Sequence, residues 1–159
     1  MMRSHRCAIS GSLALYFFDP ARNWIPADMD LYVPKNRKNR VLRYLLCTGY
    51  NPVNISSNRS SYKLECGMDK VITMCNGDVN IDVIITSGRN SIAPITHFHL
   101  TAVMNFLSAD GFFSAYPNLT ADGRALCNPL QFYHHQPRSL TAYCYQKYAL
   151  RRYDIRINP

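Results

Sequence analysis

Hydrophobic and polar positions alternate most clearly near the middle of the chain. Two runs rich in β-branched residues, 70–75 and 79–86, flank Asn76-Gly77, the preferred dipeptide of a tight hairpin turn. This pattern predicts a β-hairpin. Residues 28–33 also alternate, with Asp, Asp and Tyr on one side and Met, Leu and Val on the other, and they predict a further strand.

Three longer segments have the spacing of amphipathic helices. The apolar residues of segment 35–50 fall on one helical stripe, which consists of Val41, Leu42, Leu45 and Leu46. Residues 94–111 predict a helix with a proline in its first turn, and residues 140–153 predict a last helix that is basic toward its end. The segments 51–62 and 112–138, which are rich in polar residues or proline, predict loops.

Near the start of the chain, a short strand over residues 6–10 is predicted to lead through Gly11 into a helix over residues 12–18, with Ser12 near its N-cap. No linker and no internal repeat interrupts the pattern. The mixture of strands and helices predicts one α+β domain over residues 1–159, a small mixed β-sheet packed against helices.

Composition narrows the classes of function. Of the 159 residues, 47% are hydrophobic and 18% are charged, which is typical of a globular chain. The longest apolar stretch, residues 13–18, is far too short to span a bilayer, and no signal peptide is recognisable. We therefore expect a cytoplasmic or nuclear protein without a membrane partner. None of the six cysteines forms a C-x-x-C pair, which argues against a zinc site of that kind.

The formal net charge of +8 favours a polyanionic partner, nucleic acid first, although a basic solvated surface explains the charge equally well. The densest group of cations lies in the helix predicted after the strand at 28–33. Its members are Lys35, Arg37, Lys38, Arg40 and Arg43. These side chains either contact the phosphates of a nucleic acid or nucleotide, or form a solvated helix face, and the sequence favours neither.

Two aspartates on the strand at 28–33 are candidates for a metal site. Asp28 and Asp30 point to the same face, roughly 6–7 Å apart along it. Such a pair alone is more often solvated at a sheet edge, but a hard divalent cation between the carboxylates would also offset their repulsion. Asp82 strengthens the case, because a charge within the apolar run VNIDVIIT is rarely buried without a partner. If the two strands are neighbours, all three carboxylates can converge on one metal.

Gly11 and Ser12 supply the second part of a candidate site. A strand that passes through glycine and serine into a helix forms a site for an anion. The glycine lets a phosphate approach the backbone, the helix N-terminus offers free N–H groups, and Ser12 adds a hydroxyl. A triphosphate held at this corner would share its oxygens with a metal at the three carboxylates.

Taken in order, the Gly-Ser pair at 11–12, the D-x-D at 28–30 and Asp82 between apolar residues resemble the motifs of the nucleotidyltransferase superfamily typified by DNA polymerase beta. The resemblance covers about residues 7–86. The phrases ISGSLALYFF, WIPADMDLYVP and FHLTAVMNFLSADG are also similar to a group of fungal proteins with the same motif set. The resemblance implies a fold like the palm of polymerase beta.

The same resemblance implies transfer of a nucleoside monophosphate from an NTP, such as ATP, to a hydroxyl acceptor. Asp28, Asp30 and Asp82 would be the catalytic residues and the ligands of Mg²⁺ or Mn²⁺, and Gly11 and Ser12 would hold the β- and γ-phosphates. The net positive charge makes an RNA end the first expected acceptor, ahead of a protein hydroxyl. The alternative is a catalytically silent module of this fold that binds nucleic acid or a protein, against which the retention of three like charges argues.

Other residues with functional chemistry have simpler explanations. Residues 143–153 interleave cations with tyrosines, for which packing in the core is favoured over stacking on bases. Trp24 is likewise expected in the core rather than over a bound base. His97 and His99 diverge around a helix, so packing or capping is expected rather than a shared metal.

Overall fold

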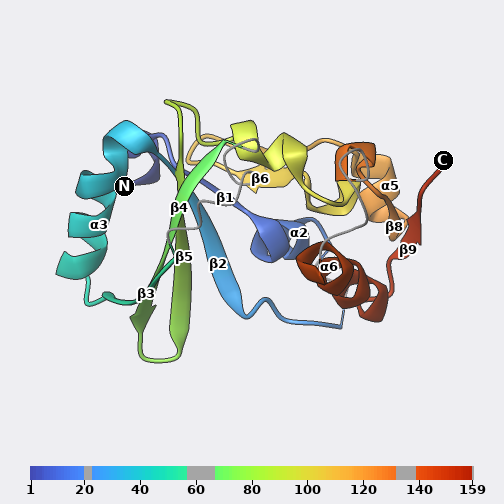
Figure 1. Cartoon of the computed structure of the whole chain (residues 1–159), viewed down its shortest axis with the longest axis horizontal. Coiled ribbons are helices and arrows are strands. Elements are labelled where there is room, and N and C mark those ends of the chain that lie inside the picture. The colour runs from blue at the N-terminus through green and yellow to red at the C-terminus, as the bar shows by residue number, and fades with distance from the viewer. Residues whose placement is uncertain (20–22, 57–66, 132–138, 159) are drawn as a thin grey trace.

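The computed structural model describes residues 1–19, 23–56, 67–131 and 139–158 (Figure 1). Its central sheet has seven strands, in the spatial order β3 (Asn51–Ser56), β4 (Met68–Asn76), β5 (Val79–Thr86), β2 (Asp28–Pro34), β1 (Ala8–Ser10), β6 (Asn105–Leu107) and β7 (Phe112–Ser114). β2 and β5 are parallel neighbours, and the other adjacent pairs are antiparallel. This mixed sheet and its helices confirm the predicted α+β class.

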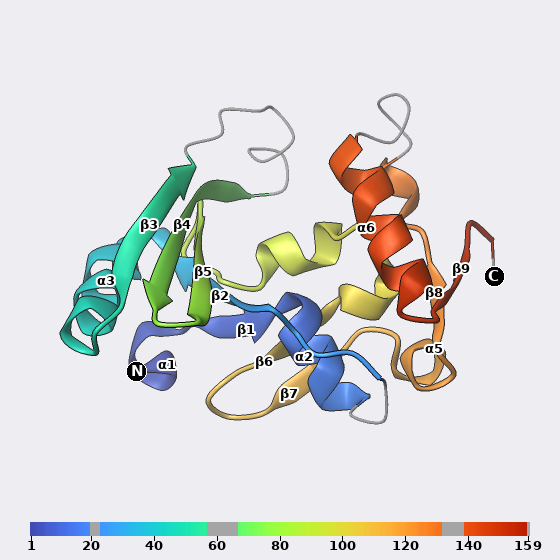
Figure 2. The same cartoon turned by 90° about the horizontal axis from the view of Figure 1, so that it is seen from below.

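Helices and a small second sheet complete the fold (Figures 1 and 2). The α-helices are α1 (Met2–His5), α2 (Gly11–Phe18), α3 (Lys38–Cys47), α5 (Pro117–Ala121) and α6 (Ser139–Leu150). The 3-10 helices are η1 (Lys35–Arg37), η2 (Ala93–His97), η3 (Thr101–Val103) and η4 (Pro129–Gln131), and the second sheet pairs β8 (Arg124–Leu126) in parallel with β9 (Asp154–Arg156). Within the described residues, no helix combines the length and the apolar character needed to cross a membrane.

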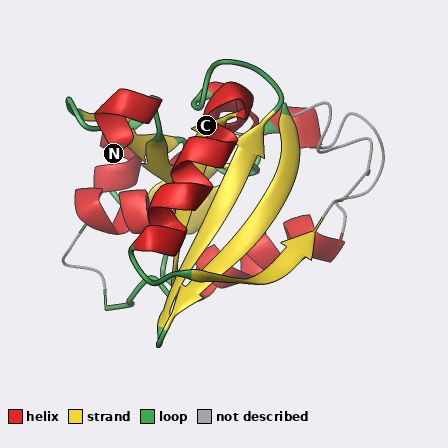
Figure 3. Ribbon diagram, turned by 90° about the vertical axis from the view of Figure 1, so that its left-hand side faces the viewer, coloured by secondary structure: helices red, strands yellow, loops and turns green. Residues whose placement is uncertain are grey.

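The two faces of the central sheet are chemically different. Leu31 and Val83 point to one face, where they pack with Val41 and Leu45 of α3 in the main core cluster. Figure 3 looks at the molecule from this side and shows a helix lying across the sheet. We call this the α3 face. Residues at the alternate strand positions point to the opposite side, which we call the carboxylate face because Asp30 lies on it.

The apolar stripe of α3 is narrower than the sequence predicts. Val41 is fully buried and Leu45 is 3% exposed, whereas Leu46 is 51% exposed. We expect Leu45→Ala to lower the free energy of unfolding by about 2–4 kcal/mol, because it leaves a cavity in the core, and Leu46→Ala to change it by less than about 0.5 kcal/mol. Urea unfolding of both variants measures the difference. Equal effects would contradict this packing of α3.

The predicted β-hairpin is present as β4 and β5. Asn76 pairs with Val79, and the two-residue loop between them begins with Gly77 at φ +58°, a conformation that favours glycine. β4 starts two residues earlier than predicted, at Met68, which pairs with Thr86 at the end of β5.

The predicted loop at 51–62 is wrong for residues 51–56, which form β3 at one edge of the sheet. β3 pairs with β4, and its register shifts between Pro52 and Asn54. A proline is tolerated in an edge strand because one side of that strand needs no ladder hydrogen bonds. Residues 57–62 lie outside the described residues.

The predicted helix over 94–111 is also wrong, since this segment is divided into η2, η3 and β6. Distant residues satisfy its backbone and side chains: Asn128 Nδ2 donates to the carbonyl of Phe98 (2.8 Å), and Thr101 Oγ1 accepts from the amide of Leu126 (2.9 Å). β6 pairs with β1 and β7. These tertiary hydrogen bonds compete successfully with the local bonds of a helix.

Other segments differ in their boundaries. The predicted loop at 112–138 contains β7, α5, β8 and η4, while residues 132–138 lie outside the described residues. β1 is shorter than predicted, because α1 precedes it. α2 starts at Gly11, so Ser10 rather than Ser12 is at its N-cap.

Candidate functional site

Three carboxylates lie together on the carboxylate face. The register of the parallel strands β2 and β5 pairs Asp30 with Asp82 and Asp28 with Asn80. Paired residues of neighbouring strands point to the same side of a sheet, so the three aspartates form one group. Neighbouring strands are about 4.8 Å apart, and residues two apart along a strand are separated by roughly 6–7 Å.

Alternation along β2 and β5 explains this placement. Met29 and Leu31 on β2, like Ile81 and Val83 on β5, pack in the core cluster on the α3 face. A shift of one residue in either strand would turn the carboxylates into this cluster and expose the apolar side chains. Because an unpaired charge is costly among apolar groups, core packing keeps the aspartates on the other face.

Asp30 lies in an unfavourable electrostatic environment. Its pKa is raised to about 7, first by burial and then by the charges of Asp28 and Asp82, while the charge of Lys147 opposes the shift. Asp82 Oδ1 accepts a hydrogen bond from Thr73 Oγ1 at 2.6 Å. Among the described residues, no ion pair compensates any of the three carboxylates. The group therefore holds excess negative charge that a cation would offset.

The corner formed by Gly11 and Ser12 lies beside this group. Ser10 pairs with Asp30 across β1 and β2, so the chain enters α2 next to the Asp30 side chain. Gly11 has φ +68°, and a Cβ built on it would overlap with Oδ2 of Asp30. Both corner residues are buried, and the Ser12 Oγ has no hydrogen-bond partner among the described residues.

Among the described residues, no side chain caps the start of α2. The hydroxyl at its N-cap, that of Ser10, donates instead to the carbonyl of Asn105 (2.5 Å). The first amides of α2 therefore receive no side-chain acceptor, and the buried hydroxyl of Ser12 lies next to them. An anion at this corner would meet backbone N–H groups that donate to no described side-chain cap.

α6 brings a lysine to the carboxylates from the far end of the sequence. This helix was predicted over 140–153 and ends at Leu150. Lys147 is close enough to Asp30 to lower the pKa of that carboxyl. The pKa of Tyr148 is raised mainly by burial, and the charges of Asp30 and Asp28 contribute. Lys147 thus lies where a phosphate approaching the carboxylates would meet a cation, although the sequence pattern of residues 143–153 favoured packing in the core over binding to nucleic acid.

Tyr145, Tyr148 and Tyr153 pack in the core, in agreement with the simpler interpretation, whereas Tyr143 is 61% exposed. Tyr148 and Tyr153 are each 4% exposed and belong to a cluster with Leu15 of α2. The Arg151 guanidinium lies 3.9 Å from the centroid of the Trp24 ring, a cation–π contact. This contact connects α6 to the segment that precedes β2, and so helps to position α6 near the carboxylates.

The two histidines of the η2 region pack separately. His97 Nδ1 lies 3.2 Å from the carbonyl of Ala93. The His99 ring lies 6.0 Å from each of the Tyr145 and Tyr148 rings, and its pKa is lowered to about 4, mainly by burial and also by the charge of Lys147. Over the described ranges of the chain, no group of three or more His, Cys, Asp or Glu side chains is arranged to hold a metal ion as it stands.

The basic helix lies apart from the carboxylates. Its five cations, predicted as contacts for nucleic acid, are Lys35, Arg37, Lys38, Arg40 and Arg43. They belong to η1 and α3, and α3 packs on the opposite face of the sheet. The structure therefore brings together the Gly-Ser corner and the three aspartates, and it separates both from these cations.

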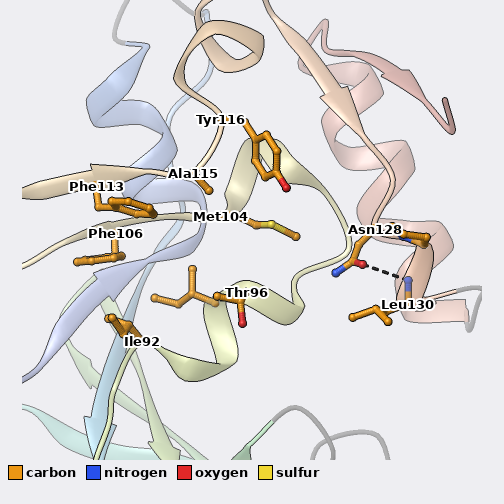
Figure 4. A pocket seen from close by; sticks show the side chains of 11 residues that line it. Ile92, Thr96, Met104, Phe106, Phe113, Ala115, Tyr116, Asn128 and Leu130 are labelled. Carbon is orange, nitrogen blue, oxygen red and sulfur yellow. Dashed lines mark hydrogen bonds between the residues drawn. The ribbon is translucent and has the colours of Figure 1, made fainter. Parts of the chain in front are cut away.

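An apolar cavity also lies apart from the carboxylates. Its volume is about 680 Å³, and its mainly apolar walls include Ile92, Met104, Phe106, Phe113, Tyr116 and Leu130 (Figure 4). The rings of Phe106 and Phe113 stack with their centroids 5.2 Å apart. The described lining residues include no carboxylate, histidine, cysteine or cation, so this cavity suits an apolar group but lacks groups for metal ligation.

No protein-family model matches the chain, and no curated protein matches it. Of the candidate groups, the carboxylates have the chemistry of a metal site, and the apolar cavity does not.

Proposed function

We propose that the chain is a metal-dependent nucleotidyltransferase, which moves a nucleoside monophosphate from an NTP to a hydroxyl acceptor. An RNA end is the first candidate acceptor, and a protein hydroxyl is the second. The register of β2 and β5 carries the proposal, because it sets three aspartates on one face beside the Gly-Ser corner. We also propose that the sheet is a polymerase beta palm-like fold, which the order of these motifs along the chain supports.

The residues fit a divalent cation in charge and in ligand type. Three carboxylates share one side of the sheet, and burial and like charges raise the pKa of Asp30 to about 7. A dication would offset this charge, and hard cations such as Mg²⁺ and Mn²⁺ prefer carboxylate oxygens. When bound, the metal would supply Lewis acidity that activates the hydroxyl and neutralises phosphate charge.

The three aspartates would share the cation, and Asp82 would also accept a proton. Asp28, Asp30 and Asp82 would hold the cation through their carboxylates. Thr73 engages Oδ1 of Asp82, which leaves Oδ2 to accept the proton of the attacking hydroxyl. The acceptor oxygen then bonds to the α-phosphorus as the bond to pyrophosphate breaks.

Residues beyond the aspartates would bind the triphosphate. Backbone N–H groups at Gly11 and the hydroxyl of Ser12 would donate to the β- and γ-phosphates. Lys147 would offset the charge of the departing pyrophosphate, because its charge already acts on Asp30. Such contacts orient the α-phosphorus toward the acceptor.

A labelled-transfer assay tests the proposed function. The purified chain is incubated with Mg²⁺ or Mn²⁺, each α-labelled NTP in turn, and total RNA or protein. Asp28→Asn and Asp82→Asn are each expected to reduce incorporation by at least about a thousandfold, since each removes several kcal/mol of transition-state stabilisation. Asp78→Asn removes an exposed carboxylate at the tip of the β4–β5 hairpin and is the matched control. It should keep full activity.

Two results would contradict the proposed function. One is a wild-type chain that labels no acceptor with any NTP. The other is incorporation that persists in both aspartate variants. Binding of RNA without transfer by the wild type would favour the silent binding module.

A further inference from the structure

Basic side chains from three separate segments gather around α3. We call them the basic surface, which consists of Arg6, Arg37, Lys38, Arg40, Arg43 and Arg89. Four of the six are exposed, and Arg37 and Lys38 are half-buried. None of the six has an ion-pair partner within the described part of the chain.

Hydrogen bonds connect the three segments. The Ser91 hydroxyl donates to the carbonyl of Arg6 (2.8 Å), and the Lys35 amide donates to the carbonyl of Gly88 (3.1 Å). Arg89 therefore lies on a short loop between the N-terminal segment and η1. Figures 1 and 2 show the N-terminus and α1 on the same side of the molecule as α3. The segments that carry the six cations thus lie next to one another on one side of the molecule, although they are far apart in the sequence.

Acidic residues near this surface are already engaged. Asp110 pairs with Arg3 (2.5 Å), and Asp69 pairs with Lys35 (3.1 Å). η1 and α3 contain no acidic residue, and cations occupy the N-cap and first turn of α3, at the positive end of the helix dipole. This concentration of like charge is unfavourable for the chain alone, and a polyanion would relieve it.

The side chains suit nucleic acid better than an acidic protein. All but one of the six cations are arginines, which bind phosphate oxygens through two parallel hydrogen bonds. Tyr44 is 48% exposed, follows Arg43 directly and lies one turn after Arg40. An exposed aromatic ring between arginines can stack on an unpaired base, whereas an acidic protein offers no such base.

We propose that the basic surface binds single-stranded RNA, with its arginines on the phosphates and Tyr44 stacked on a base. A hollow of about 240 Å³ lies beside it, and its lining includes Arg3, Arg6 and Asn90 together with Asp110, which pairs with Arg3. α3 and the carboxylates lie on opposite faces of the sheet. Binding at the basic surface therefore stands apart from the proposed transfer chemistry.

Fluorescence anisotropy with a labelled oligouridine, without NTP or metal, tests this proposal. Arg40→Glu with Arg43→Glu should weaken binding about tenfold or more, and each lost phosphate contact should reduce the slope of log K against log salt by about 0.7. Arg152→Glu with Arg156→Glu makes the same change in charge at exposed positions beyond α6. This control should bind within about threefold of the wild type.

Tyr44→Ala separates stacking from charge. It should weaken binding to oligouridine about tenfold and leave binding to poly-L-glutamate unchanged. Equal losses in the two charge-reversed pairs would overturn the basic surface as the binding site. Poly-L-glutamate binding as tightly as oligouridine would overturn the assignment to RNA in favour of an acidic protein. Circular dichroism melts check that each variant is folded, and the binding result is independent of the transfer assay.

Discussion

Replacing Asp30 with asparagine is expected to abolish nucleotidyl transfer and to stabilise the metal-free protein. Because burial and two neighbouring carboxylates raise the pKa of Asp30 to about 7, ionisation of this group costs free energy in the folded state. Asparagine has almost the same shape and no charge. We expect Asp30→Asn to increase the free energy of unfolding by about 2–3 kcal/mol at pH 8, with allowance for solvent screening of a half-buried group.

This gain should depend on pH in a definite direction. Asp30 titrates near pH 7 in the folded chain, against an ordinary value of 3.8. Between these values the folded state keeps a proton that the unfolded state has lost, so wild-type stability falls as pH rises. Below about pH 4 the carboxyl is protonated in both states, and Asp30→Asn should be nearly neutral. Urea unfolding of both proteins in EDTA, from pH 4 to pH 8, measures the trend.

Bound metal should make the wild type more stable than Asp30→Asn, the reverse of their order without metal. Saturating Mg²⁺ should raise the melting temperature of the wild type by mass action, with little effect on Asp30→Asn. Asp78→Asn, the control on the hairpin, should respond to Mg²⁺ as the wild type does. An Asp30→Asn variant that is less stable than the wild type in EDTA at pH 8 would contradict the electrostatic account. Retained transfer would contradict the proposed site.

Replacing Gly11 with alanine is expected to damage both the fold and the site. Its φ of +68° lies in the left-handed region, where a side chain costs about 1–2 kcal/mol. The new Cβ would overlap with Oδ2 of Asp30 and lie 2.9 Å from its Cγ, so the carboxylate or β2 must move. We expect Gly11→Ala to lower the free energy of unfolding by about 2–4 kcal/mol and to abolish transfer.

Gly77 provides a matched control for this substitution. It also has positive φ, +58°, but a Cβ on it would meet nothing within 4 Å. Gly77→Ala should therefore cost only the backbone contribution, about 1 kcal/mol. Combining Gly11→Ala with Asp30→Ala should recover about 1 kcal/mol or more, because the overlapping atoms are gone. Equal costs at the two glycines, or no recovery in the double variant, would contradict the close approach of Gly11 to Asp30.

Elements with a strong local pattern were predicted well. The hairpin of β4 and β5 follows from β-branched runs around a turn dipeptide, and β2 follows from strict alternation. The placement of Asp28 and Asp30 on one face depends only on the period of a strand. Asp82 was predicted to lie with them only on the condition that β5 is a neighbour of β2.

Segments whose hydrogen bonds come from distant residues were predicted badly. Residues 94–111 have a helical pattern, but they take partners from β1, β7 and Asn128. Residues 51–56 are polar, yet pairing with β4 makes them an edge strand. In both segments the competing interactions were too far away in the chain for a local pattern to include them.

The sequence by itself determined which residue types are present for metal and phosphate chemistry, and on which side of their own strand the aspartates lie. Only the tertiary structure decided that β2 and β5 are parallel neighbours in a register that aligns Asp30 with Asp82. It also brought Lys147 to these carboxylates and left the cations of α3 across the sheet from them. The reason is that side-chain direction along a strand follows from its own backbone, whereas the pairing of strands and the docking of helices depend on apolar surface buried by the whole chain.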